Sequence, residues 1–273
     1  MANTVFSQPG AALRAEKIDD NLYIVTGGMA NTAFFIGDKE VVAIDAQMTA
    51  DGARQMIEEI KKITSKPLTT VILTHSDADH INGLVGFPRG LQIISSSGAR
   101  KEMEAALNAP NAPDLRPYLP TRTFDNRMEI DLGSFSLELF HFGPAHTSGD
   151  IVIYSPKNRL ALVGDLVFIG RDPLIHRFKG GNSNGLIKTL QAMLKLDADR
   201  FAPGHNKIIG RAEIETLLKD IQEKQGAVKK LAAEGKTLEE TKKQFGIATA
   251  PAKPGAFSFP SLVEVMYLEI TGQ

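Results

Sequence analysis

The segment 74–80 constrains this chain more than any other part of its sequence. It reads Thr-His-Ser-Asp-Ala-Asp-His and directly follows the apolar run 71–73. Four of its seven residues have side chains that commonly bind metals: His75, Asp77, Asp79 and His80. A buried strand that ends in such a cluster delivers several ligands to one point at the edge of a sheet.

The backbone conformation of this segment decides which of these side chains can meet. If the segment is extended, alternate side chains face the same side, so His75, Asp77 and Asp79 would point one way. A tight turn at the boundary between strand and loop would then be needed to aim His80 at the same place.

Three more candidate ligands lie downstream. His146 and His205 follow glycine- and proline-rich turns, and Asp165 ends an apolar run of its own. The chain has no cysteine, which excludes disulfides and thiolate ligands. Imidazoles and carboxylates suit zinc, iron or manganese. Seven ligands exceed what one tetrahedral ion needs, so we expect two ions about 3.5–4 Å apart that share a carboxylate.

The apolar pattern predicts an α/β fold. Short β-rich runs at 22–25, 32–36 and 41–44 indicate an antiparallel meander, and a helical pattern at 50–63 leads into the strand 71–73 as a βαβ unit. Further strands are predicted at 91–95, 127–130, 135–142, 151–154, 160–163 and 200–202, and further helices at 97–107, 185–196, 212–233, 237–245 and 262–270. Two mixed β-sheets packed face to face, with helices on both outer faces, accommodate this order as a four-layer αββα sandwich.

Length and charge bound the remaining possibilities. The 273 residues are enough for one large domain spanning 1–273, in which 1–14 form a loose N-terminal segment and 210–273 form C-terminal helices. The 31 basic and 32 acidic residues give a net charge of −1, which argues against a nucleic-acid partner. No apolar stretch approaches the roughly 20 residues of a membrane span, and residues 1–10 lack a signal core. We therefore expect a cytoplasmic protein, although a removed secretory leader would leave no trace.

In the order and spacing of its ligands, the chain resembles the metallo-β-lactamase-fold superfamily. The hallmark of that family is a His-x-His-x-Asp-His loop after a strand, followed by a distant His, an Asp and a final His. Here the loop reads His-x-Asp-x-Asp-His, and His146, Asp165 and His205 match the later elements. The resemblance covers roughly residues 22–208 and implies the same αββα fold. Asp77 departs from the family pattern, which usually has a histidine there.

The resemblance also implies how two divalent ions would be held. The first ion would be bound by His75, Asp77 and His146, the second by Asp79, His80 and His205, and Asp165 would bridge the two. The expected ion is Zn²⁺. Because Asp77 adds a negative charge and a hard oxygen ligand, iron or manganese gains weight at the first position, and bound water should be acidified less.

From this site we expect a metallohydrolase that acts on a small molecule. A hydroxide held between the ions would attack an ester, lactone, thioester, amide (including β-lactam) or phosphoester bond, with a promiscuous substrate range, and Asp79 would accept or shuttle the proton. An alternative is a mononuclear iron oxidoreductase that resembles persulfide dioxygenases and uses His75, His146 and Asp165. A binding protein with a degenerate site is disfavoured by the near-complete ligand set.

Other residues carry both a functional and an ordinary interpretation. His176, Arg171 and Lys179, in the loop 170–184, and Met29, in a flap with Asn31, could contact substrate, or could be loop and turn residues. Three further residues have structural alternatives: Asp45 either orients a ligand histidine or ends a strand, and Asp150 and His141 are more consistent with a turn and a strand. The helices from Ala212 onward either cover the site or form the face of a homodimer.

Overall fold

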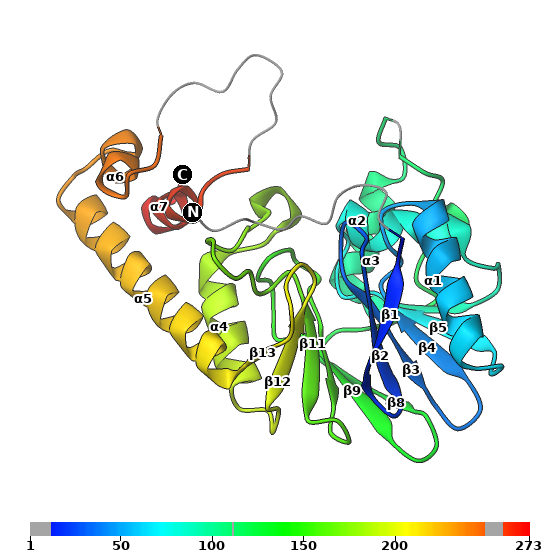
Figure 1. The fold of residues 1–273 in the computed structure, drawn as a ribbon. Coiled ribbons are helices and arrows are strands. Elements are labelled where there is room, and N and C mark those ends of the chain that lie inside the picture. Colours follow the sequence, from blue (N-terminus) through cyan, green and yellow to red (C-terminus); the bar gives the residue numbers. More distant parts are fainter. Residues whose placement is uncertain (1–11, 111, 249–258) are drawn as a thin grey trace.

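A computed structural model describes residues 12–110, 112–248 and 259–273 and contains two β-sheets that pack face to face (Figure 1). The first sheet has seven strands in sequential order: β1 (Arg14–Asp19), β2 (Leu22–Thr26), β3 (Thr32–Ile36), β4 (Val41–Ile44), β5 (Leu68–Ile72), β6 (Gln92–Ser96) and β7 (Arg122–Phe124). Strands β1 to β4 pair antiparallel, and β4 to β7 pair parallel. The predicted meander and the βαβ unit β4–α1–β5 are therefore confirmed.

The second sheet has six strands in the order β13-β12-β11-β10-β9-β8. Its members are β8 (Arg127–Asp131), β9 (Ser136–Phe140), β10 (Val152–Ser155), β11 (Leu160–Gly164), β12 (Arg200–Pro203) and β13 (Ile209–Gly210). All neighbours are antiparallel except β11 and β12, which are parallel. Because β11 and β12 run in the same direction, the residues that follow them emerge at the same end of the sheet.

Helices cover the outer faces of both sheets (Figure 1). The α-helices are α1 (Ala50–Ile63), α2 (Ala78–Ile81), α3 (Ser97–Ala106), α4 (Ser183–Met193), α5 (Arg211–Ala233), α6 (Leu238–Gln244) and α7 (Leu262–Thr271), and the 3-10 turns are η1 (Asn82–Gly86), η2 (Arg116–Tyr118) and η3 (Arg177–Lys179). The helices α1 and α3 lie against the first sheet, whereas α4, α5 and α7 pack against the second. Within the described residues, no helix is both long and apolar enough to span a membrane.

Three apolar layers account for this four-layer arrangement. Successive residues of a strand point to opposite faces, so Phe34 packs toward α1 with Met56, while Phe35 packs between the sheets with Leu137. A third layer, which includes Phe201, fills the space between the second sheet and its helices. The predicted αββα sandwich is confirmed.

Three strands were missed: β1, β7 and β13, of which the last two are too short to show a period. β7 has three residues and β13 has two, and each exists through pairing with a longer neighbour. At the N-terminus, β1 begins at Arg14, inside the segment 1–14 expected to be loose, and residues 1–11 lie outside the described part of the chain. The strands β5, β11 and β12, which precede candidate ligands, lie close to their predicted positions, whereas α2, which carries Asp79 and His80, was not predicted.

Candidate metal centre

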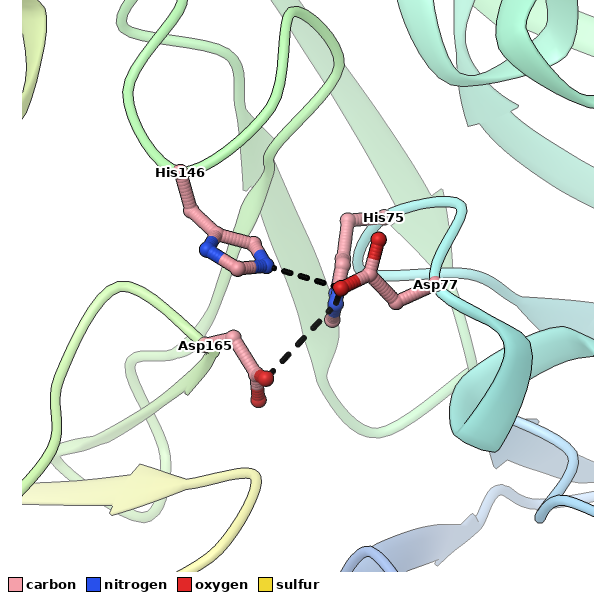
Figure 2. Close-up of side chains that lie close together, drawn as sticks. All are labelled: His75, Asp77, His146 and Asp165. Carbon is pink, nitrogen blue, oxygen red and sulfur yellow. Dashed lines mark hydrogen bonds and ion pairs between the residues drawn. The ribbon is translucent and has the colours of Figure 1, made fainter. Parts of the chain in front are cut away.

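The candidate ligands gather at one end of the two sheets. His75 and Asp77 follow β5, Asp165 follows β11 and His205 follows β12, while His146 comes from the loop between β9 and β10. Figure 2 shows His75, Asp77, His146 and Asp165 turned toward one another from three separate segments. The fold therefore collects residues that are up to 130 positions apart in sequence.

All seven predicted ligands lie in two adjoining groups, within each of which the potential ligand atoms are no more than 4.8 Å apart. The first group consists of His75, Asp77, His146 and Asp165, and the second of Asp79, His80 and His205. Asp165 also faces the second group, because its Oδ1 lies 3.3 Å from His80 Nε2 and its Oδ2 lies 3.1 Å from His205 Nε2. Its position between the groups is the one that a shared carboxylate requires.

The segment 74–80 is not extended beyond Asp77, so the condition under which Asp79 would share a direction with His75 and Asp77 is not met. Helix α2 begins at Ala78, and the carbonyl oxygen of Asp77 accepts a hydrogen bond from the backbone N–H of His80 at 2.9 Å. A helix rotates successive side chains by about 100° instead of reversing them. Asp79 therefore points to His205, with 3.2 Å between Oδ2 and Nε2, instead of sharing a direction with His75 and Asp77.

A single carboxylate orients two of the histidines. Asp45 accepts hydrogen bonds at 2.7 Å from Nδ1 of His80 and from Oγ1 of Thr74. Because the Thr74 hydroxyl donates to Asp45, it accepts from Nδ1 of His75, which lies 2.9 Å away. Both imidazoles therefore carry their proton on Nδ1 and direct Nε2 to the centre. Of the two interpretations left open for Asp45, the structure shows the carboxylate–imidazole bond, and the relay through Thr74 was not predicted.

His146 is oriented in the same way by a backbone carbonyl. Its Nδ1 lies 2.9 Å from the carbonyl oxygen of Leu174, which can only accept, so Nδ1 carries a proton. Its Nε2 faces Asp77 Oδ2 at 3.0 Å. The lone pairs of Nε2 and Oδ2 repel each other at that distance unless a proton or a metal ion lies between them.

Three buried polar atoms at the centre have no hydrogen-bond partner in the described part of the chain, as expected if the site is built to bind a metal ion. Among the described residues, His75 Nε2, His80 Nε2 and Asp165 Oδ1 are buried and make no hydrogen bond. Buried polar groups normally have partners, and these three converge with the other ligand atoms on the same space. Imidazole nitrogens and carboxylate oxygens in this arrangement fit divalent zinc, iron or manganese.

Without metal, protons on the histidines balance the carboxylates. Burial disfavours the charged form of His146 and of His205, but hydrogen bonds to Asp77 and to Asp165, respectively, outweigh burial and raise both pKa values to about 9. For His75 burial prevails and lowers its pKa to about 4. Burial would raise the pKa of Asp77, but its bonds to His146 and His176 hold that pKa well below its usual range. Asp77 is therefore a carboxylate at any working pH.

The loop 170–184 contacts Asp77 directly. His176 is only 4% exposed, and its Nε2 lies 2.8 Å from Asp77 Oδ2. Lys179 Nζ lies 2.7 Å from Asp77 Oδ1 and donates to the carbonyl oxygen of Ser76 at 3.0 Å. The interpretation of His176 and Lys179 as solvated loop residues is therefore wrong. No local sequence signal could have revealed this contact, because about 100 residues separate Asp77 from the loop.

The remaining candidates have identifiable local roles. The Asp150 carboxylate accepts from the N–H and hydroxyl of Thr147 at 2.9 and 2.8 Å, which confirms the turn interpretation. His141 donates from Nδ1 to the backbone carbonyl of Asp150 at 2.8 Å and is structural, but it lies just beyond β9, which ends at Phe140, and not in the predicted strand. Arg171 lies over the ring of Phe168, 4.1 Å from its centroid. Asn31 donates from its side chain to the carbonyl oxygens of residues 203 and 206, which fixes the turn that carries His205.

Four exposed apolar side chains belong to segments that surround the centre: Met29, Ile169, Phe178 and Phe259. Met29 lies two residues from Asn31, and the backbone N–H of Ile169 donates to the side chain of Asn206, next to His205. The rings of Phe178 and Phe259 lie 5.2 and 4.7 Å from that of His176. Among the described residues only one other large apolar side chain, Ile63, is similarly exposed. We call these four residues the apolar rim.

Comparison with known proteins agrees with this fold and site. The profile of the metallo-beta-lactamase superfamily matches residues 25–205. The chain is 29% identical over 208 residues to the 2,4-dinitroanisole O-demethylase subunit alpha of Nocardioides sp. (strain JS1661), covering 75% of this chain and 61% of that protein. It is 28% identical over 173 residues to a metallo-beta-lactamase type 2 of Elizabethkingia meningoseptica, covering 60% of this chain and 66% of that protein. The match thus spans less than two thirds of either relative.

Solved structures show the same architecture. A metallo-beta-lactamase from Pontibacter korlensis superposes with a TM-score of 0.65 at 19% identity, covering 77% of this chain and 99% of that one. Because the family profile spans most of the two sheets and every candidate ligand, the chain belongs to the metallo-beta-lactamase superfamily. Membership implies divalent metal ions, typically zinc, and the cluster of histidines and aspartates fits them.

Proposed function

We propose that this protein is a binuclear metal-dependent hydrolase. The observation that supports it best is the pair of adjoining ligand groups that share Asp165. His75, Asp77 and His146 would hold the first ion, and Asp79, His80 and His205 the second. Two divalent ions, when bound, supply Lewis acidity and lower the pKa of water from 15.7 to about 7.

The chain's own residues would orient these ligands and move the proton. Asp45, through His80 and Thr74, and Leu174, through His146, keep Nε2 of three imidazoles directed to the centre. Asp79 has the most exposed carboxylate side chain of the centre, at 22%. Burial would raise its pKa, but the hydrogen bond to His205 lowers it, so Asp79 is ionised and is placed to accept a proton and pass it to solvent.

The apolar rim supports a small organic substrate with an apolar group. We propose that this group lies against the rim while an ester, lactone, thioester, amide or phosphoester bond meets the centre. A cavity of about 500 Å³ beside the rim, between the segment 168–172 and α5, offers room for such a group. Phe168, which lines this cavity, stacks on the ring of His205 at 5.7 Å. The name of one relative specifies 2,4-dinitroanisole, a small aromatic compound.

A mononuclear oxidoreductase explains less of the site. It would use His75, His146 and Asp165 and leave the second group, with its buried His80 and the carboxylate of Asp45 behind it, without a purpose. The number of ions that the protein binds therefore discriminates between the two functions.

The test combines metal content with a substrate panel. Purified protein is analysed for zinc, iron and manganese and assayed with chromogenic esters, lactones, phosphodiesters and β-lactams, with and without oxygen. About two ions per chain and turnover that is independent of oxygen would support the proposal. One iron per chain, together with oxygen consumption, would overturn it.

A further inference from the structure

Both carboxylate oxygens of Asp77 are occupied by the loop that follows β11. Oδ1 accepts from Lys179 Nζ at 2.7 Å, and Oδ2 lies 2.8 Å from His176 Nε2. The pair is largely shielded from water, since the side chains of Asp77 and Lys179 are 15% and 21% exposed. Lys179 also donates to both oxygens of Ser76 at 3.0 Å, so its ammonium group is held in place from several sides.

The positive charge of Lys179 is unexpected beside a group of residues that would bind a metal cation. Three carboxylates surround the centre: Asp77, Asp79 and Asp165. In the ion pairs that the described residues make, Asp79 and Asp165 contact only histidines, whereas Asp77 also contacts a lysine. A permanent cation beside a site for cations opposes their binding. It is tolerated only if a neighbouring carboxylate neutralises it.

The same loop also fixes the histidine of the first group. The backbone N–H of His176 donates to the carbonyl oxygen of His146 at 2.8 Å, and the carbonyl oxygen of Leu174 accepts from His146 Nδ1. The loop therefore holds His146 and Asp77, which face each other at 3.0 Å, in one arrangement. The hydrogen bond from His176 takes up one lone-pair direction of Oδ2 and leaves the other for an ion.

We propose that Lys179 is the counter-charge of Asp77 and that His176 is a positioning residue of the first metal group. This inference rests on the proposed binuclear site. The Asp77–Lys179 pair is neutral overall, so it acts toward an ion as a neutral ligand that offers one oxygen, and charge alone no longer favours iron or manganese there. His176 determines which oxygen faces the ion.

A double-mutant cycle on metal affinity tests the counter-charge. Metal-free wild type, Asp77→Asn, Lys179→Met and the double variant are titrated with Zn²⁺ against a chelator. Asp77→Asn should raise the dissociation constant of the first ion by roughly a hundredfold, because it leaves Lys179 as an unpaired cation. Adding Lys179→Met should recover at least about tenfold of that loss. Lys179→Met alone should leave the affinity unchanged or increase it.

The outcomes separate this inference from the proposed function. If Lys179→Met weakens binding by the same factor in both backgrounds, the lysine only supports the loop and the counter-charge role is refuted, while the binuclear site stands. If the wild type binds no Zn²⁺, both proposals fail. In the Asp77→Asn background Lys179→Arg keeps the positive charge and should not recover affinity, which shows that charge is what matters. Lys188→Met, on the exposed side of α4, controls for the loss of a surface lysine.

His176 has a matched pair of variants of its own. His176→Gln keeps an N–H donor for Asp77 Oδ2, whereas His176→Leu removes it. The leucine variant should lower the affinity of the first ion by about tenfold, as loss of a partner behind a ligand typically does, and the glutamine variant should retain most of it. Equal losses in both variants would overturn the role assigned to this hydrogen bond.

Discussion

Asp45 accepts a hydrogen bond from Nδ1 of His80 at 2.7 Å, although the two residues lie 35 positions apart in the chain. Asp45 has a φ of 61°, a left-handed conformation that few residues with a side chain adopt readily. Its other contacts go to the N–H and hydroxyl of Thr74, the residue that orients His75. One strained aspartate therefore sets the direction of one imidazole in each metal group.

Replacing Asp45 with Asn should weaken metal binding. Asn tolerates the left-handed backbone, but its single side-chain oxygen cannot accept all three of the bonds that Asp45 accepts. We expect a 10- to 100-fold loss of Zn²⁺ affinity, as for other residues that support a ligand histidine. Chelator competition measures it, and the exposed Asp125→Asn is the control. Unchanged affinity would show that the imidazoles keep their orientation without Asp45.

Removal of the shared carboxylate should reduce the number of ions bound. Asp165→Ala removes the oxygens that face His80 and His205 and also removes one carboxylate from the first group. We expect the stoichiometry to fall from about two ions per chain to one or fewer, with activity reduced by at least about a hundredfold. Metal analysis after dialysis gives the stoichiometry. Full activity in this variant would exclude the bridging role.

Gly204 should not tolerate a side chain. A Cβ at this position would lie 2.3 Å from Asp165 Oδ1 and 2.9 Å from His80 Cε1, so Gly204→Ala must displace a ligand. We expect a loss of about 1–3 kcal/mol in the free energy of unfolding, typical of overpacking, together with reduced metal content. Thermal denaturation and metal analysis report the two effects.

The control for this substitution lies on α5. A Cβ at Gly226 would meet no atom within 4 Å, and alanine favours the helix by about 0.5–1 kcal/mol, so Gly226→Ala should leave metal content unchanged and raise stability slightly. Equal behaviour of the two variants would contradict the close packing at residue 204.

Metal binding should release protons. The pKa values of about 9 for His146 and His205 mean that both are mostly protonated at pH 7 in the metal-free protein, and an ion must displace those protons. Affinity should therefore rise with pH up to about 9. Calorimetry in buffers of different ionisation enthalpy counts the protons, and we expect about two per chain at pH 7.

The same shifts predict how the metal-free protein responds to pH. Because the folded pKa values of His146 and His205 lie above the unfolded value of about 6.5, protonation stabilises the fold fully below about pH 6.5. That contribution is lost as the pH rises through 9. Denaturant unfolding of metal-free protein at pH 6.5 and pH 9.5 checks the sign, and higher stability at pH 9.5 would contradict it.

Truncation of the apolar rim should affect substrate binding more than turnover. Phe178 is 71% exposed beside the ring of His176. We expect Phe178→Ala to raise KM for a phenyl or long-chain ester by about tenfold, the effect of losing a large apolar contact, with little change for an acetyl ester. Ile63→Ala, at the end of α1, removes an equally apolar residue away from the centre. The same KM increase in both variants would show that the rim does not bind substrate.

Much of the fold follows from local pattern. The helix Ala50–Ile63 was predicted to the residue because its apolar stripe is regular, and in the structure Thr49 caps its start. The strands β3 and β4 were found because their apolar runs end at glycine and aspartate turns. The conformation after Asp77 was not predicted, because a four-residue helix has no period to read, and Asp77, which precedes it, is held by the distant loop that follows β11.

The sequence by itself determined which residues could bind metal, because imidazoles and carboxylates at strand ends retain that chemistry wherever the chain places them. The family resemblance implied how they divide into two groups around Asp165. Only the tertiary structure decided the helical turn after Asp77, which directs Asp79 to His205. It also brought Lys179 and His176 against Asp77, across about 100 residues of sequence. Such contacts depend on how loops from two sheets meet at one edge, and that meeting is fixed by the packing of the whole sandwich, which local spacing does not encode.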